Sequence, residues 1–130
     1  MVARLFHAAS LLREHRGDGH IAALMTEGIG GLEAHVLFAL DMGMPAENFG
    51  RIHHLPAAQL ATVVDGVRDR DLIGEDGWLT KQGRAVRQRV EALTDALAGK
   101  PYESLGPDEL DDLVAGLEPL ATLLLAAQDW

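Results

Sequence analysis

The sequence predicts an all-α domain that carries one short two-stranded hairpin. Three observations predict this fold class. Apolar residues recur at helical spacing through most of the chain, glycines and prolines separate the helical stretches, and one Asp-Gly pair stands between two short extended segments. A length of 130 residues, with 48% hydrophobic and 24% charged side chains, is typical of one globular domain with a packed core. We therefore expect residues 1–130 to form a single domain.

Residues 1–30 are expected to hold two helices separated by a turn. Residues 2–14 repeat apolar side chains at helical spacing. Gly17 and Gly19 follow, and two glycines so close together are expected to end this helix. A second, shorter helix then runs to a glycine cluster that begins at Gly28.

Residues 31–80 are expected to contain two helices followed by the hairpin. The first of these helices ends at Gly43. Pro56 suits the first position of the second helix, because its fixed φ fits there and its missing N–H is not needed. Asp76 and Gly77 form the dipeptide typical of a tight hairpin turn, so the hairpin is expected around them.

Residues 81–130 are expected to form two long helices. Thr80 can cap the first of them, and Gly99 ends it. The last helix begins near Pro107, and acidic residues fill its first turn, where the helix dipole favours negative charge. Pro119 lies inside this helix and removes one of its backbone hydrogen bonds.

Composition excludes several classes of protein. The chain has no cysteine, which excludes disulfides, thiolate metal sites and cysteine nucleophiles. No apolar run approaches the roughly 18 residues that a membrane span needs, and the N-terminus lacks the features of a signal peptide. We therefore expect a cytoplasmic protein with no membrane partner. The net charge is −9, and most of it lies in residues 91–130, where nine acidic residues accompany one base, Lys100.

A resemblance to a known family is carried by the stretch QLATVVDGVRDRDLIGEDGWLTKQGRAVRQRVEALTDAL. This stretch resembles the recognition helix, wing and following long helix of the MarR family. The continuation, LGPDELDDLVAGLEPLATLL, is similar to the helices through which MarR proteins dimerise. The resemblance covers residues 31–125. It implies a winged helix-turn-helix fold, a homodimer through the terminal helices, and a crevice for small aromatic or amphipathic ligands.

The N-terminal stretch RLFHAASLLREHRGDGHIAAL carries a narrower resemblance. It is similar to a segment of a group of uncharacterised actinobacterial proteins, in which the stretch with HRGDGH precedes a MarR-like half. Members of that group are often much longer, so this chain resembles their second half standing alone. The resemblance implies kinship and assigns no chemistry.

The stretch REHRGDGH, residues 13–20, is the first candidate site. Its two glycines would let a loop fold back, so that Asp18 could orient one imidazole and Arg16 could hold an anion. His15 and His20, together with Asp18, are therefore the candidate catalytic residues, with an imidazole as general acid or base. The competing interpretation is a polar turn, in which Asp18 caps a helix starting near His20 and both histidines lie at the surface.

A ligand pocket is the second candidate site. His7, Leu11 and His15 share one helical face at i, i+4 and i+8, so they could line one groove. The predicted lining comes from the first helix, the REHRGDGH stretch and the third helix: His7, Leu11, His15, Arg16, His20, His35 and Phe38. Histidines scattered over surface and core are the competing interpretation. None of the histidine spacings forms a tight metal-binding motif, so we predict no metal and no cofactor.

The helix expected over residues 56–70, with the connector before it, supplies the candidate DNA contacts of a regulator. These are Arg51, His53, His54, Gln59, Thr62, Arg68 and Arg70. Phosphate contacts supply most non-specific DNA affinity, and a typical binder makes about 6–10 of them. Residues 56–80 carry five acids and two bases, and the tip of the expected wing has two acids and no base. This acidic wing disfavours duplex DNA as a partner.

A basic stripe opens the helix after the expected wing. Lys81, Arg84 and Arg87 share one side of this helix, and Arg89 lies nearby. The stripe could hold an anion, but a solvated helix surface is the favoured interpretation.

These patterns lead to three hypotheses for the function. In the first, which we favour, the chain is a winged-helix protein that binds a small molecule and is linked to specialised metabolism. In the second, it is a MarR-like transcription regulator that binds duplex DNA as a dimer. In the third, it is an enzyme of specialised metabolism that uses His15 or His20 as acid or base. The acidic wing favours the first and third hypotheses, and the resemblance favours the second.

Overall fold

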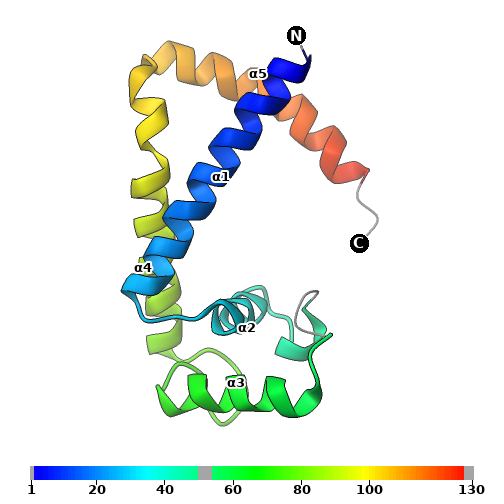
Figure 1. Cartoon of the computed structure of the whole chain (residues 1–130), viewed down its shortest axis with the longest axis vertical. Helices are drawn as coiled ribbons and strands as arrows, with labels where there is room; N and C mark the ends of the chain where they lie inside the picture. Colours follow the sequence, from blue (N-terminus) through cyan, green and yellow to red (C-terminus); the bar gives the residue numbers. More distant parts are fainter. Residues whose placement is uncertain (1, 50–53, 128–130) are drawn as a thin grey trace. The chain divides into compact units, whose positions relative to one another are not determined.

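The structure is a computed structural model that describes residues 2–49 and 54–127 (Figure 1). It divides into two compact units, Met1–Ala98 and Gly99–Trp130. The first unit contains α1 (Val2–Thr26), α2 (Gly31–Asp41), the 3₁₀ turn η1 (Ala46–Asn48), α3 (Ala57–Asp69) and α4 (Lys81–Ala98). The second unit contains the 3₁₀ turn η2 (Lys100–Ser104) and α5 (Pro107–Ala126).

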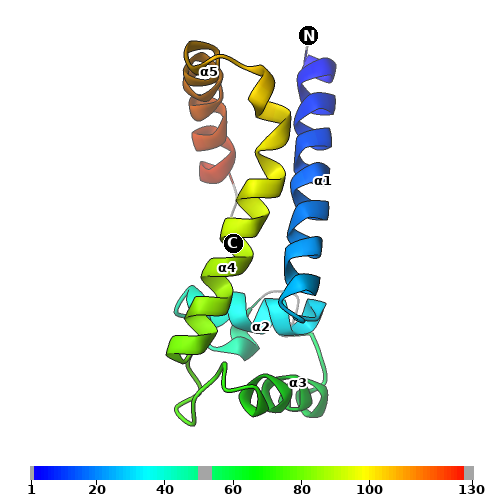
Figure 2. The same cartoon turned by 90° about the vertical axis from the view of Figure 1, so that its left-hand side faces the viewer.

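Within the first unit, α1 and α4 form an antiparallel pair. The two helices run side by side in both views, and α2 and α3 lie beyond the end of the pair at which α1 finishes and α4 starts (Figures 1 and 2). The unit therefore consists of a helical pair and a smaller lobe that holds α2, η1, α3 and the connecting loop, residues 70–80.

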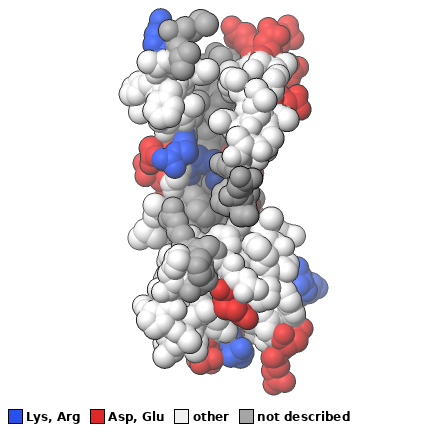
Figure 3. Space-filling model, turned by 90° about the vertical axis from the view of Figure 1, so that its right-hand side faces the viewer, with Lys and Arg blue, Asp and Glu red and all other residues white. Residues whose placement is uncertain are grey.

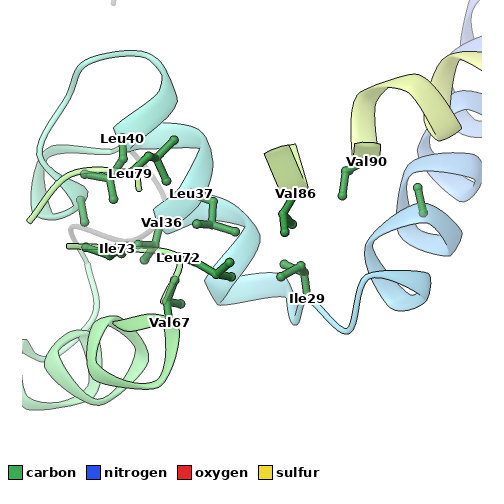
Figure 4. Close-up of a cluster of buried hydrophobic side chains, with 12 residues drawn as sticks. Ile29, Val36, Leu37, Leu40, Val67, Leu72, Ile73, Leu79, Val86 and Val90 are labelled. Atoms are coloured by element: carbon green, nitrogen blue, oxygen red, sulfur yellow. The ribbon is translucent and has the colours of Figure 1, made fainter. Parts of the chain in front are cut away.

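A hydrophobic core joins the lobe to α4. Figure 4 shows side chains from α2, α3, the loop and α4 meeting in one cluster, which includes Leu37, Val67, Leu72 and Val86. Leu37 and Val67 are each at most 1% exposed. Burying an aliphatic side chain of this size contributes about 1.5–3 kcal/mol relative to leaving it exposed. The inner face of α3 is held by this core, and its other face is left to solvent.

The predicted break in the first helix was wrong. One continuous helix, α1, passes through Gly17 and Gly19 and ends only at Thr26. Gly19 is buried, and a Cβ built on it would lie 3.1 Å from the Cβ of Leu97 on α4. A glycine here lets two helices approach closely, and the packing offsets its poor helix propensity, which costs about 1 kcal/mol relative to alanine. The predicted end of helix near Gly28 is confirmed, since this residue has a φ of +65°.

The predicted fold class was also wrong, because the two-stranded wing is not formed. The described residues are all-helical, and the expected hairpin contains only one isolated antiparallel bridge, between Ile73 and Leu79. The reason is the shortness of the connection. On one side of the bridge, Leu72 already donates its N–H back to Val67 at the end of α3. On the other side, the N–H of Thr80 completes the bridge by bonding the carbonyl of Leu72, and α4 begins at the next residue, Lys81. Too few residues remain between the two helices to extend a ladder.

The predicted starts of the other helices agree with the structure to within a residue or two. Thr80 caps α4, since its Oγ1 accepts the N–H of Gly83 at 2.9 Å. Pro56 immediately precedes the first residue of α3. Pro107 opens α5, and the side chain of Glu109 accepts the N–H of Gly106 at 2.9 Å, as the acidic first turn predicts.

The second unit is dominated by the exposed α5. None of the described residues of this helix is buried. Its large apolar side chains are between 38% and 69% exposed: Leu110, Val114, Leu117, Leu120, Leu123, Leu124 and Leu125. An apolar helix left uncovered to this extent is typical of an interaction surface.

An ion pair ties the end of α1 to α4. Arg89 donates to both carboxylate oxygens of Glu27, with distances of 2.8–3.2 Å. These hydrogen bonds hold the pKa of the Glu27 carboxyl below its ordinary value of 4.5, although partial burial opposes the shift. They also raise the pKa of Arg89.

The lowered pKa of Glu27 predicts a pH dependence of stability. A carboxyl whose pKa is lower in the folded chain contributes stability above its unfolded pKa, and this contribution is lost as the pH falls through the folded pKa. Glu27→Gln should therefore lower the urea midpoint at pH 7, and its difference from wild type should shrink as the pH falls below 4.5 and vanish once the pH is below the lowered pKa of Glu27. Glu75→Gln, at an exposed loop position, is the matched control. An equal loss for the two variants at pH 7, or a Glu27→Gln difference that does not shrink as the pH falls below 4.5, would contradict this prediction.

Candidate functional site

The REHRGDGH stretch lies in the second half of α1 and faces α4. His15 donates from Nε2 to the carbonyl of Leu97 at 3.2 Å, and His20 Nδ1 lies 3.0 Å from the Oγ1 of Thr94. The Thr94 hydroxyl gives its one proton to the carbonyl of Val90 at 2.7 Å. It must therefore accept from His20, which assigns the Nδ1–H form to this imidazole. Both histidines thus hold two helices together.

Arg16 and Asp18 complete the stretch in different ways. Arg16 lies 3.3 Å from a carboxylate oxygen of Glu91 and 3.8 Å from one of Asp95, so its partners are protein acids on α4. Asp18 is exposed, and among residues 2–49 and 54–127 no hydrogen bond joins it to His15 or to any other imidazole. The assignment of catalytic roles to the two histidines and Asp18 stays a prediction, since helix packing accounts for the contacts observed.

The predicted ligand-lining residues fall into two separate groups. His7 and Leu11 lie in the first half of α1, and both are exposed. His35 and Phe38 lie on α2, beyond the other end of α1 (Figure 1). Both α2 rings meet Phe49, with ring centroids 5.7 Å apart for His35 and 5.3 Å apart for Phe38. The structure therefore does not bring these two groups together, and the predicted ligand pocket stays a prediction.

A cavity of about 260 Å³ lies between the end of α2 and the middle of α4. It is lined by Asp41, Arg84, Arg87, Gln88 and Glu91. Arg87 is only 7% exposed, and its guanidinium carbon lies 5.4 Å from the centre of the Phe38 ring. This distance is within the range of a cation–π contact.

Sequence reasoning placed Arg87 in a solvated basic stripe, and it missed this buried position. A signal for burial was present in the spacing of α4. Arg87 stands one residue after Val86, three before Val90 and seven before Thr94, which places it on the apolar face of the helix. Because Arg87 is charged, it was predicted to lie at the surface, although the helical period places its position on the core side of α4.

The predicted DNA contacts are only partly available. Arg51 and His53 lie outside the described residues. His54 and Gln59 are exposed near the start of α3, and Thr62 is exposed one turn further on. The hydroxyl of Thr62 donates to a backbone carbonyl of its own helix.

Two of the three arginines in the predicted DNA-binding set, Arg68 and Arg70, are held by protein acids and carbonyls. Arg68 pairs with Asp65 at 2.7 Å. Arg70 donates to the carbonyl of Gly28 at 2.9 Å and contacts Glu33 at 3.3 Å, so it caps the end of α1 instead of pointing to solvent. On the face shown in Figure 3, acidic and uncharged side chains separate the basic side chains of the lower lobe.

The described residues offer neither a cluster of metal ligands nor a single membrane-spanning helix. No group of three or more histidine, aspartate or glutamate side chains among residues 2–49 and 54–127 is placed to hold a metal ion. In the same part of the chain, no single helix has the length and apolar character to cross a membrane. Residues Ala3–Thr26 and α2 have this length and apolar character only when taken together, and the two helices are bent by 97° relative to each other.

The fold therefore defines a helix-turn-helix protein, in which α3 follows α2 along the chain, packs against it and presents one face to solvent. The chain belongs to a helix-turn-helix family, whose pattern it matches over its full length, residues 1–130. No curated protein and no solved structure matches it.

Proposed function

We propose that this protein is a transcription regulator that binds duplex DNA through the first two turns of α3. The composition of that surface carries the proposal. The exposed residues over this length are small or uncharged: Ala57, Ala58, Gln59, Ala61 and Thr62. In a helix-turn-helix the N-terminal residues of the second helix contact base edges, and small side chains there allow a close approach. Glutamine and threonine are both capable of reading base edges.

The acidic residues of α3 lie outside this surface. Asp65 and Asp69 belong to the last two turns, and Asp65 is neutralised by Arg68. They lower affinity for phosphate without blocking the first two turns. We therefore propose weak binding that rests on fewer than the usual ~6–10 phosphate contacts, and a correspondingly shallow dependence on salt.

Likeness to the MarR family forms part of this proposal. The sequence of residues 31–125 supports it, although the wing that the likeness implies is not formed. Kinship with the actinobacterial group is also part of this proposal. The HRGDGH stretch alone supports it.

A glutamate at position 59 tests the proposed surface. Gln59→Glu should weaken binding to a labelled mixed-sequence duplex at low salt by at least about tenfold, because the new charge faces the groove edge. Gln88→Glu, an equal charge change at an exposed site on α4, should weaken binding by less than about twofold, since it adds only long-range repulsion. Fluorescence anisotropy measures both. Equal losses in the two variants, or no binding by wild type at low salt, would contradict DNA recognition by α3.

We also propose that two copies pair through α5. The exposed apolar side chains of this helix support the pairing, because a second identical surface would remove them from water. Two copies would present two α3 helices, as dimeric regulators do. Sedimentation equilibrium tests the proposal, and a single species of 14.0 kDa at tens of micromolar chain would contradict it.

Small-molecule binding is the second candidate function. The cavity beside Arg87 favours it, because a buried charged side chain there borders open space next to an exposed aromatic ring. This location differs from the groove expected from the sequence between His7 and Phe38. The enzyme hypothesis stays a prediction, and no observation in the described residues favours it over a packing role for His15 and His20.

A further inference from the structure

A second cavity, of about 300 Å³, lies within the lobe, between η1, α3 and the connecting loop. Its buried lining is apolar and includes Leu40, Ala46 and Ile73, each at most 7% exposed. A long side chain that enters such a cavity can lay its methylene groups on the apolar lining and keep a charged head at the mouth. The cavity therefore suits a side chain with a hydrocarbon stem and a polar end.

The exposed side chains around this cavity carry negative charge. Glu47 lines it from η1 and Asp76 lines it from the loop. Neither carboxylate has an ion-pair partner among residues 2–49 and 54–127. Arg68 also lines the cavity, but Asp65 pairs with it at 2.7 Å. The uncompensated charge at the mouth is therefore that of the two carboxylates, which attract a cation.

An exposed aromatic ring completes the surroundings of the cavity. Trp78 lines it and is 41% exposed. The face of an indole is the best aromatic partner for a cation, and arginine makes such contacts more often than lysine. The guanidinium is also flat, so it stacks on the ring and meets carboxylates along its edge. An indole and two carboxylates around one cavity therefore select a guanidinium.

The exposure of these side chains indicates the source of the guanidinium. A small-molecule site buries about 70–90% or more of its ligand. Here Glu47, Asp76 and Trp78 are all exposed, so a small ligand would stay partly in water. A partner protein covers the mouth with its own surface, and excluding water in this way strengthens the contact inside. Tryptophan and arginine are also enriched among the residues that carry the binding energy of protein interfaces.

We infer that this cavity binds an arginine side chain of a basic partner protein. The guanidinium lies between the carboxylates of Glu47 and Asp76 and stacks on Trp78. From α3, the cavity is lined by Val64 and Arg68 of the second half of the helix, so the first two turns, proposed to bind DNA, stay outside it. The inference therefore adds a protein partner to the proposed function and does not depend on it.

The probe is the peptide acetyl-Ala-Ala-Arg-Ala-Ala-amide, and its citrulline analogue is the neutral isostere. Trp130→Phe leaves Trp78 as the one tryptophan of the full chain, so the indole N–H resonance in an NMR spectrum reports on the cavity. The arginine peptide, added to about 5 mM at about 0.15 M salt, should shift this resonance. It should bind at least about tenfold more tightly than the citrulline analogue, because citrulline keeps the shape and loses the charge. It should also bind at least about threefold more tightly than N-acetylargininamide, because its flanking residues cover the mouth.

Two glutamate variants test whether the cavity itself attracts the peptide. Glu47→Gln removes one of its carboxylates and should weaken binding of the arginine peptide by about three- to tenfold. Glu75→Gln makes the same charge change next to Asp76 but outside the lining, and should weaken binding by less than about twofold at this salt concentration. Equal losses in the two variants would overturn the inference, because long-range attraction by an acidic loop would then explain the binding.

Three further outcomes would overturn the inference. The first is equal binding of the two peptides, or no shift of the Trp78 resonance. The second is N-acetylargininamide that binds as tightly as the peptide, since the cavity would then take a free organic cation. The third is a shift caused by duplex DNA and not by the peptide, which would assign the loop to the DNA surface. None of these outcomes decides the comparison of Gln59→Glu with Gln88→Glu, so DNA recognition by α3 is tested separately.

Discussion

Replacing Gly83 with alanine should leave the first unit unfolded or barely stable. Gly83 lies in the first turn of α4, where the loop crosses it, and a Cβ there would overlap the carbonyl oxygen of Leu72. The new atom would also lie 3.2 Å from the Cδ2 of Leu79. That carbonyl cannot move freely, because it accepts the N–H of Thr80, the residue that caps α4. We expect a loss of at least about 3 kcal/mol in the free energy of unfolding, measured by urea titration.

Gly66→Ala is the control for this prediction. Gly66 is also a helical glycine of the first unit, on α3, and no described atom other than its close neighbours lies within 4 Å of its Cβ position. Alanine there should gain up to about 1 kcal/mol, because it costs less entropy in a helix than glycine. A Gly83→Ala chain as stable as wild type would show that the loop and α4 are not in this close contact.

The second large effect is expected within the REHRGDGH stretch itself. Gly19→Gln should lower the free energy of unfolding by about 2 kcal/mol or more, because the side chain would enter the contact between α1 and α4. The nearest atoms of α4 to the Cβ position are the Cβ of Leu97 at 3.1 Å and the backbone nitrogen of Ala98 at 3.9 Å.

Gly17→Gln makes the same change two residues earlier and should act in the opposite direction. No described atom other than its close neighbours lies within 4 Å of the Gly17 Cβ position, and the residue is exposed. Glutamine is the better helix former, so a gain of about 0.5–1 kcal/mol is expected. Urea denaturation measures both variants. If the stretch were a turn, Gly17→Gln would not stabilise the chain, and equal effects at the two positions would contradict a helix that packs on one side.

The wing shows how a local signal can be correct and still mislead. Asp76 and Gly77 do form a turn, since Gly77 has a φ of +80° and the Asp76 side chain accepts the N–H of Trp78 at 3.0 Å. A turn dipeptide predicts the reversal of the chain, but it does not state how many residues on either side are free to pair. Here most residues on either side of the turn belong to α3 or α4, so a single bridge forms in the described loop.

The candidate site was predictable in part. The sequence predicted the helix that begins near Pro56, and it gave Gln59 and Thr62 as candidate DNA contacts; both are exposed on α3. The partners of Arg70 and Arg87 could not be predicted, because these acids and carbonyls are far away in the sequence. Arg70 reaches Gly28, 42 positions earlier, and Arg87 reaches Asp41, 46 positions earlier.

Local chemistry in the sequence determined where most helices begin and end. The cap at Thr80, the proline before α3 and the positive φ of Gly28 act within a few residues, so their effects can be calculated from sequence neighbours. Tertiary structure decided whether glycines in α1 break the helix or admit a neighbour. It also decided which groups His15 and His20 contact. Both outcomes depend on α4. The α4 residues that contact REHRGDGH are more than seventy positions away in the sequence, so only folding brings the two segments together.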